Sequence, residues 1–171
     1  NETGAVLRAT SMGDKYDLFF TALSIENIEP DIELTNTVED LSGTNIDGAD
    51  VALGQEMYYV ITFDNIGNDD GANFTLRDKL PVNVDPLLDE IIFPDNGDPI
   101  NYTFDPNTNE IVFNIPDSYI EVADNMYSIK IKVKVLEDCF GLRDACATVL
   151  ENLAYGTYSG VLNDNIITDD P

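Results

Sequence analysis

The sequence contains no histidine and no tryptophan, and lysine and arginine together number only 8 of its 171 residues. Without histidine, the chain lacks the commonest general base and the commonest transition-metal ligand. A Ser-His-Asp or Cys-His nucleophilic site therefore cannot be assembled from it. The chain also has no apolar run near the ~18 residues that a membrane-spanning helix needs. These absences argue against a hydrolytic enzyme and against membrane insertion.

Positive charge is scarce, and negative charge is abundant. The 33 acidic residues leave a formal net charge of −25. A field of this sign repels phosphate backbones and anionic lipid headgroups. We therefore expect neither nucleic acid nor a membrane surface among the partners. The chain starts at Asn1 without a signal-like segment, which predicts a processed product or a fragment of a longer, exported protein.

The acidic residues have a particular composition. Aspartate accounts for 22 of them and glutamate for 11, and there are 17 asparagines. Short polar side chains compete with the helical backbone and favour turns, caps and sites for hard cations. With 43% apolar residues to form a core, this composition indicates a loop-rich β protein.

Alternation of apolar and polar residues predicts several strands separated by clusters of turn residues. The clearest alternation runs over residues 127–135, and shorter runs lie at 57–63, 72–77 and 111–115. We predict an all-β fold, an immunoglobulin-like Greek-key β-sandwich of about seven strands with little helix. The residues expected in its core are Met57, Tyr59, Ile61, Phe63, Phe74, Leu76, Ile111, Phe113, Ile129, Ile131 and Val133.

Three of the few cations alternate with these core positions. Lys130, Lys132 and Lys134 share the outward face of the predicted strand 127–135. They could form a basic recognition stripe. The alternative, which we favour, is a solvated strand face whose lysines pair with neighbouring acids.

The chain divides near Pro30. Residues 30–162 carry the pattern of one sandwich domain, and residues 163–171 resemble an acidic linker to a following module. Residues 1–29 contain two short strand-like runs, and the second, residues 16–25, is apolar on both faces. Two strands are not a stable unit. We interpret residues 1–29 as strands of a preceding repeat or as an N-terminal extension of this domain.

Calcium is the cofactor that the turn residues could bind, because Ca²⁺ takes six to eight oxygen ligands from carboxylates, amides and carbonyls. The best cluster is Asp64, Asn68, Asp69 and Asp70, in a loop bounded by glycine, and a weaker one contains Asp95 and Asp98. Neither matches the helix-loop-helix calcium motif. The alternative is a solvated acidic surface without an ordered ion.

The only two cysteines, Cys139 and Cys146, are close in sequence. A two-cysteine metal site is improbable, because the chain has no histidine or further thiolate to complete a tetrahedral shell. An exported chain meets an oxidising environment. The sequence therefore predicts a disulfide between Cys139 and Cys146, with two free thiols as the alternative.

Four segments in order resemble the bacterial conserved repeat domain family, catalogued as the eleventh domain of unknown function. Residues 54–67 are similar to its strand ending in Asn-x-Gly, and residues 72–81 to its strand closing on Asp-x-Leu-Pro. Residues 127–135 and 152–155 resemble its long alternating strand and its final Asn-x-Ala strand. The resemblance covers about residues 31–165. It implies an immunoglobulin-like domain repeated within a large bacterial adhesin or stalk, without catalytic residues.

These observations lead to one principal hypothesis for function and two alternatives. The principal hypothesis is a non-enzymatic, extracellular structural or adhesion module, one repeat of a long bacterial surface adhesin, filament or stalk, whose partners are neighbouring repeats of the same or a sister chain. The first alternative is a module that binds surface glycans or proteins through loops at one end of the sandwich. The second is a domain accessory to a secreted hydrolase.

Overall fold

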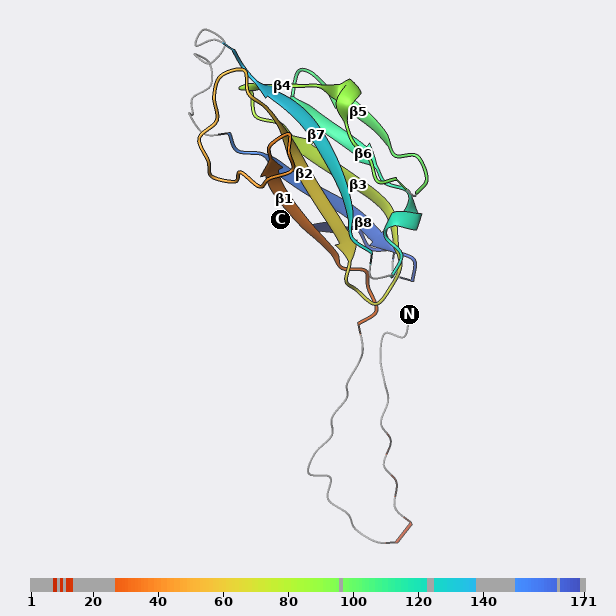
Figure 1. The fold of residues 1–171 in the computed structure, drawn as a ribbon. Helices are drawn as coiled ribbons and strands as arrows, with labels where there is room; N and C mark the ends of the chain where they lie inside the picture. Colours follow the sequence, from red (N-terminus) through yellow and green to blue (C-terminus); the bar gives the residue numbers. More distant parts are fainter. Residues whose placement is uncertain are drawn as a thin grey trace.

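The computed structural model describes residues 27–95, 97–122, 125–137, 150–162 and 164–169, together with Arg8, Thr10, Met12 and Gly13. Within these residues, two antiparallel sheets pack face to face (Figure 1). Helical structure among them is limited to two single 3-10 turns, η1 (Leu88–Glu90) and η2 (Asp117–Tyr119). In the described part of the chain, no helix has the length and apolar character needed to cross a membrane.

The first sheet has four strands in the order β1-β2-β7-β4. They are β1 (Ile32–Glu39), β2 (Glu56–Asn65), β7 (Tyr127–Val135) and β4 (Val84–Pro86). The second sheet has five strands in the order β5-β6-β3-β8-β9. They are β5 (Asn101–Asp105), β6 (Glu110–Asn114), β3 (Gly71–Lys79), β8 (Leu153–Gly160) and β9 (Ile167–Asp169).

This strand order is that of an immunoglobulin-like sandwich. The first sheet reproduces the A-B-E-D order, and β3, β8 and β9 reproduce C-F-G. Successive strands β2 and β3 lie in different sheets, as do β7 and β8. The β5–β6 hairpin extends the second sheet beyond β3. The predicted fold class is confirmed, with seven strands in the immunoglobulin order and one added hairpin.

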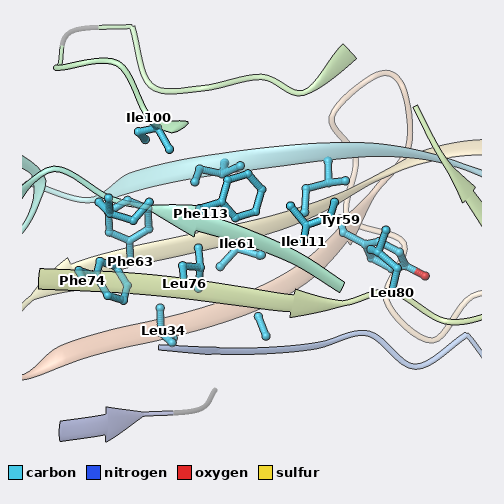
Figure 2. Close-up of a cluster of buried hydrophobic side chains, with 14 of the residues drawn as sticks. Leu34, Tyr59, Ile61, Phe63, Phe74, Leu76, Leu80, Ile100, Ile111 and Phe113 are labelled. Atoms are coloured by element: carbon cyan, nitrogen blue, oxygen red, sulfur yellow. The ribbon is translucent and has the colours of Figure 1, made fainter. Parts of the chain in front are cut away.

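The core lies between the two sheets, where the inward faces of the strands meet (Figure 2). All eleven residues predicted for the core are buried, with exposures of 1% or less. The register pairs Tyr59 with Ile131 and Ile61 with Ile129, so alternate residues of β2 and β7 face inward together. Phe63 and Phe74 meet edge to face across the two sheets, with ring centroids 5.5 Å apart, a favoured aromatic geometry.

The outward face of β7 carries the three lysines, and each pairs with an acid. Lys130 contacts Glu39, and Lys134 contacts Glu137. The ammonium of Lys132 lies 2.8 Å from a carboxylate oxygen of Glu90 and 2.9 Å from one of Glu56. This face is thus an ion-paired, solvated strand face, as favoured from the sequence, and its lysines are not an unopposed basic stripe.

One feature differs from the sequence interpretation. The sequence predicts a linker over residues 163–171, whereas Ile167–Asp169 form β9 on the edge of β8, with Ile167 opposite Tyr158 and packed against the core.

Alternation along β3 continues past Leu76 and turns Asp78 into the core. The turn that follows β3 is held by Asn109, whose Nδ2 donates to the carbonyls of Leu80 and Pro81 at 3.2 and 3.0 Å.

Candidate functional site at the end where the chain enters

One end of the sandwich collects the four residues of the first predicted calcium cluster, Asp64, Asn68, Asp69 and Asp70. Ile32 at the start of β1 lies opposite Asn65 at the end of β2, and Gly71 at the start of β3 lies opposite Gly160 at the end of β8. We call this the entry end, because residues 27–31 lead into β1 there (Figure 1). It also includes the described parts of segments 66–70, 120–126 and 161–166.

Asn65 organises the entry end from a buried position. It is 4% exposed, and its Oδ1 accepts from the backbone N–H groups of Asp31 and Gly67, each at 3.1 Å. Its Nδ2 donates to the carbonyls of Asp69 and Ile120, each at 2.8 Å. One amide therefore satisfies four backbone groups from three segments of the chain.

The entering segment 27–31 is held along its length by residues 65–68. Asn68 accepts from the N–H of Glu29 at 3.0 Å and donates to the carbonyl of Asn27 at 3.1 Å. The N–H of Ile66 donates to the carbonyl of Asp31 at 2.8 Å. A Cβ placed on Gly67 would lie 2.5 Å from the backbone nitrogen of Asp31, so only glycine permits this close approach. We call residues 65–68 the entry clamp.

Three of the four predicted calcium ligands at this end accept hydrogen bonds from backbone groups. Asp69, 5% exposed, accepts from the N–H of Leu162 at 2.9 Å. Asp70 accepts from the N–H of Val122 at 2.7 Å, while Asn68 holds the entering chain. Asp64 is half-buried on β2, opposite Glu33 of β1. The structure thus places Asp64, Asn68, Asp69 and Asp70 in one region, where three of the four side chains tie loops together.

The second predicted calcium cluster lies in the loop before β5. Asp98 accepts from the hydroxyl of Ser118 at 3.1 Å, and its carbonyl accepts from the hydroxyl of Tyr119 at 2.9 Å. Asp95 is exposed. Among the residues that the structure describes, no three acidic or thiol side chains converge in a metal-binding group. Calcium binding stays a prediction, and so does the disulfide, because Cys139 and Cys146 lie outside the described residues.

A buried polar cluster lies deeper in the sandwich, and the sequence analysis did not find it. Asp78 is fully buried, and within the described residues neither of its carboxylate oxygens has a hydrogen-bond partner. The hydroxyl of Tyr59 and the side-chain amide of Asn152 are likewise buried without one. Burial raises the pKa of Asp78 to about 7. The nearby side-chain amide of Asn152 acts in the opposite direction and offsets only part of this rise in the pKa. The sequence did hold a signal for the burial of Asp78, because Phe74, Leu76 and Asp78 alternate along β3 and so share its inward face.

The first and last described strands set a direction for the chain. β1 starts at the entry end and runs away from it, since its last residue, Glu39, lies opposite Tyr58 near the start of β2. β9 runs the same way, because Ile167 pairs with Tyr158 and Asp169 with Gly156 of the antiparallel β8. The chain therefore enters at one end (Figure 1), and the pairing of β9 with β8 points its last described strand toward the other.

Comparison with solved structures supports this architecture. The fold is similar to that of the major pilin SpaD from Corynebacterium diphtheriae, with a TM-score of 0.55, 19% identity, and coverage of 81% of this chain and 34% of that chain. It is also similar to BcpA, the major pilin subunit of Bacillus cereus, with a TM-score of 0.55, 12% identity, and coverage of 82% of this chain and 38% of that chain.

The chain spans about a third of the length of each pilin. At these identities the likeness establishes the fold, an immunoglobulin-like sandwich of the kind found in pilin subunits. No family model matches the sequence, and no curated protein matches it significantly.

Proposed function

We propose that this chain is a non-enzymatic structural module of an extracellular bacterial stalk, filament or adhesin, in which it sets the spacing between neighbouring modules. The observation that carries the proposal is the entry clamp, which holds residues 27–31 by hydrogen bonds on both sides of Gly67. A segment held in this way fixes the direction from which a preceding module approaches. A flexible linker would not need such contacts.

Two further observations support the proposal. The chain enters at one end while β9 points toward the other, an arrangement suited to modules placed end to end. The two solved structures with a similar fold are a major pilin and a major pilin subunit, which agrees with a structural role. Membership of the conserved repeat domain family, location at the cell surface, and neighbouring repeats as partners are parts of the same proposal.

The test uses two copies of the chain joined in tandem, with the overall length measured by small-angle X-ray scattering. A spacer predicts an extended particle with a narrow distribution of lengths. Asn65→Ala in the second copy should broaden that distribution, because it removes the contacts between Asn65 and the entering segment. Asn109→Ala, which removes two hydrogen bonds at the opposite end of the sandwich, is the matched control and should leave it narrow. A broad distribution in the unmodified tandem would contradict the proposal.

The alternative of a binding module makes a different prediction. If the loops of one end recognise a surface glycan or protein, the single chain should be retained on a column carrying that polysaccharide or protein. If the chain is retained at both low and high ionic strength and the tandem proves flexible, the binding module becomes the favoured hypothesis and the spacer is rejected.

A further inference from the structure

A cavity of about 270 Å³ lies at the end of the sandwich opposite the entry end, between the loop 46–51 and the adjoining ends of β1 and β2. Its lining extends from the exposed Asp50 to the fully buried Tyr59, so the cavity connects the surface with the core. Most of the remaining wall is apolar and includes Val38, Ile46, Val51, Met57 and Leu150.

The buried polar cluster described above lies at the inner side of this cavity. Burial and, second, the charge of Asp78 raise the pKa of Tyr59, so the carboxyl of Asp78 lies near a residue of the cavity wall. Asn36 alternates along β1 with Val38, another wall residue, which lies opposite Tyr59 in the sheet. The Nδ2 of Asn36 donates to the carbonyl of Asn152 at 3.3 Å. The apolar wall and the polar cluster therefore form one site.

The polar cluster has more acceptors than donors. Among the described residues, both carboxylate oxygens of Asp78 and the Oδ1 atoms of Asn36 and Asn152 are buried without a hydrogen-bond partner, as are the hydroxyl of Tyr59 and the Nδ2 of Asn152. No described lysine or arginine forms an ion pair with Asp78. Because unsatisfied buried oxygens cost free energy, the site favours a cationic ligand that is rich in donors.

A primary ammonium group has the matching chemistry, since it carries three donors and no acceptor. Calcium is disfavoured here, because it prefers several carboxylate ligands and no three acidic or thiol side chains converge among the described residues. An unbranched aliphatic chain behind the ammonium group would lie along the apolar wall. The carboxylate of Asp50 in the lining adds negative charge that attracts a cation.

We propose that this cavity binds a primary ammonium group carried on an unbranched aliphatic chain, with the side-chain oxygens of Asp78, Asn36 and Asn152 as its acceptors. Two sources offer this group, the lysine side chain of a partner protein and a free alkylamine or diamine. The inference concerns the isolated chain and holds whether or not the module acts as a spacer.

Nuclear magnetic resonance titration of the full chain with n-pentylamine at pH 8 tests the proposal. At this pH the carboxyl of Asp78, with its pKa of about 7, is mostly ionised. The methyl resonances of Val38, Ile46 and Val51 should shift saturably, while those of Ile66 at the entry end stay unchanged. n-Pentanol, which has the same chain without the charge, should bind about tenfold more weakly or less.

Two pairs of variants separate the polar cluster from the apolar wall. Asp78→Asn keeps the shape and should weaken the amine about tenfold or more, whereas Asp89→Asn at an exposed position in η1 should not. Val51→Phe should fill the cavity and block the amine, whereas Val112→Phe on β6, outside the lining, should leave binding intact. The melting temperature of each variant verifies that it is folded.

A short peptide with one internal lysine distinguishes the two sources, with the same peptide carrying norleucine as its control. Tighter binding of the lysine peptide than of n-pentylamine supports a site for a partner's lysine. Tighter binding of n-pentylamine, or of the diamine of the same length, supports a site for free amines. The proposal is overturned if neither the amines nor the peptide shift the cavity methyl resonances, if n-pentanol binds as tightly as the amine, or if Asp78→Asn leaves the affinity unchanged.

Discussion

At the scale of single residues, Asp78 is the most unusual group in the sandwich. Its carboxyl is fully buried without a hydrogen-bond partner among the described residues, and its pKa is raised from 3.8 to about 7. Because the folded-state pKa lies above the unfolded one, the unfolded state binds fewer protons between these values. The free energy of unfolding therefore falls as pH rises from about 4 to about 7, and levels off above that.

The variant Asp78→Asn isolates this effect, since it keeps the shape and removes the charge. We expect it to raise the free energy of unfolding by about 2–4 kcal/mol at pH 8 and by little at pH 4. Denaturant unfolding at both pH values measures the difference. Asp89→Asn, at an exposed position in η1, is the control and should show no such pH dependence. Equal effects of Asp78→Asn at pH 4 and pH 8 would rule out the buried charge as their cause.

A comparison of Asn65 with Asn68 measures how much burial increases the contribution of a side-chain hydrogen bond in the entry clamp to stability. Asn65→Ala removes hydrogen bonds to backbone groups of three segments, two of them buried, and should cost about 2–4 kcal/mol of stability. Asn68 is exposed, so water replaces its partners, and Asn68→Ala should cost less than about 1 kcal/mol. Thermal unfolding of the two variants side by side gives the comparison. A cost for Asn68→Ala as large as that for Asn65→Ala would contradict the burial argument.

At the scale of elements, neighbouring residues of β7 face opposite environments. Ile131 is fully buried, and Ile131→Ala should cost about 2–5 kcal/mol through lost burial and the cavity left behind. Lys132 forms two ion pairs on the outward face with Glu56 and Glu90, whose side chains are 35% and 54% exposed, and Lys132→Met should change stability by less than about 1 kcal/mol. Chemical denaturation measures both. A larger loss for Lys132→Met would mean that its ion pairs matter more than their solvent exposure implies.

The connection after β7 carries the predicted disulfide. Mass spectrometry of the unreduced protein should find Cys139 and Cys146 linked, with no thiol available for alkylation. The short loop would gain about 2–3 kcal/mol from closure, so reduction should lower the melting temperature modestly. Two alkylatable thiols in the exported protein would refute both the bridge and the extracellular location that rests on it.

Four of the described strands were predictable from sequence because each carries its own two-residue period. β2, β3, β6 and β7 bury the residues that alternation selects, including Phe63 and Ile129. β9 was not predictable, because three residues are too few to display a period. Its pairing with β8, where Ile167 lies opposite Tyr158, can be seen only in the folded chain. The role of Asn65 also depends on three separate segments meeting, which no local pattern records.

At the scale of the whole molecule, the net charge of −25 acts on stability through self-repulsion. Sodium chloride should raise the melting temperature by screening it. If Ca²⁺ binds at Asp64, Asn68, Asp69 and Asp70 or at Asp95 and Asp98, millimolar Ca²⁺ should raise the melting temperature beyond sodium chloride of equal ionic strength, and a chelator should reverse the gain. Equal effects of the two salts would end the calcium hypothesis.

The unequal lengths of the two terminal strands have a mechanical consequence. Tension applied through both ends of the chain pulls β1 and β9 along their own axes, so their ladders are loaded in shear. β1 is joined to β2 by eight residue pairs and β9 to β8 by only three. Under load, β9 should therefore detach first and lengthen the chain, while β1 and the core stay folded. The molecule would then yield in two stages, with the short strand serving as a reversible extension before the sandwich itself opens.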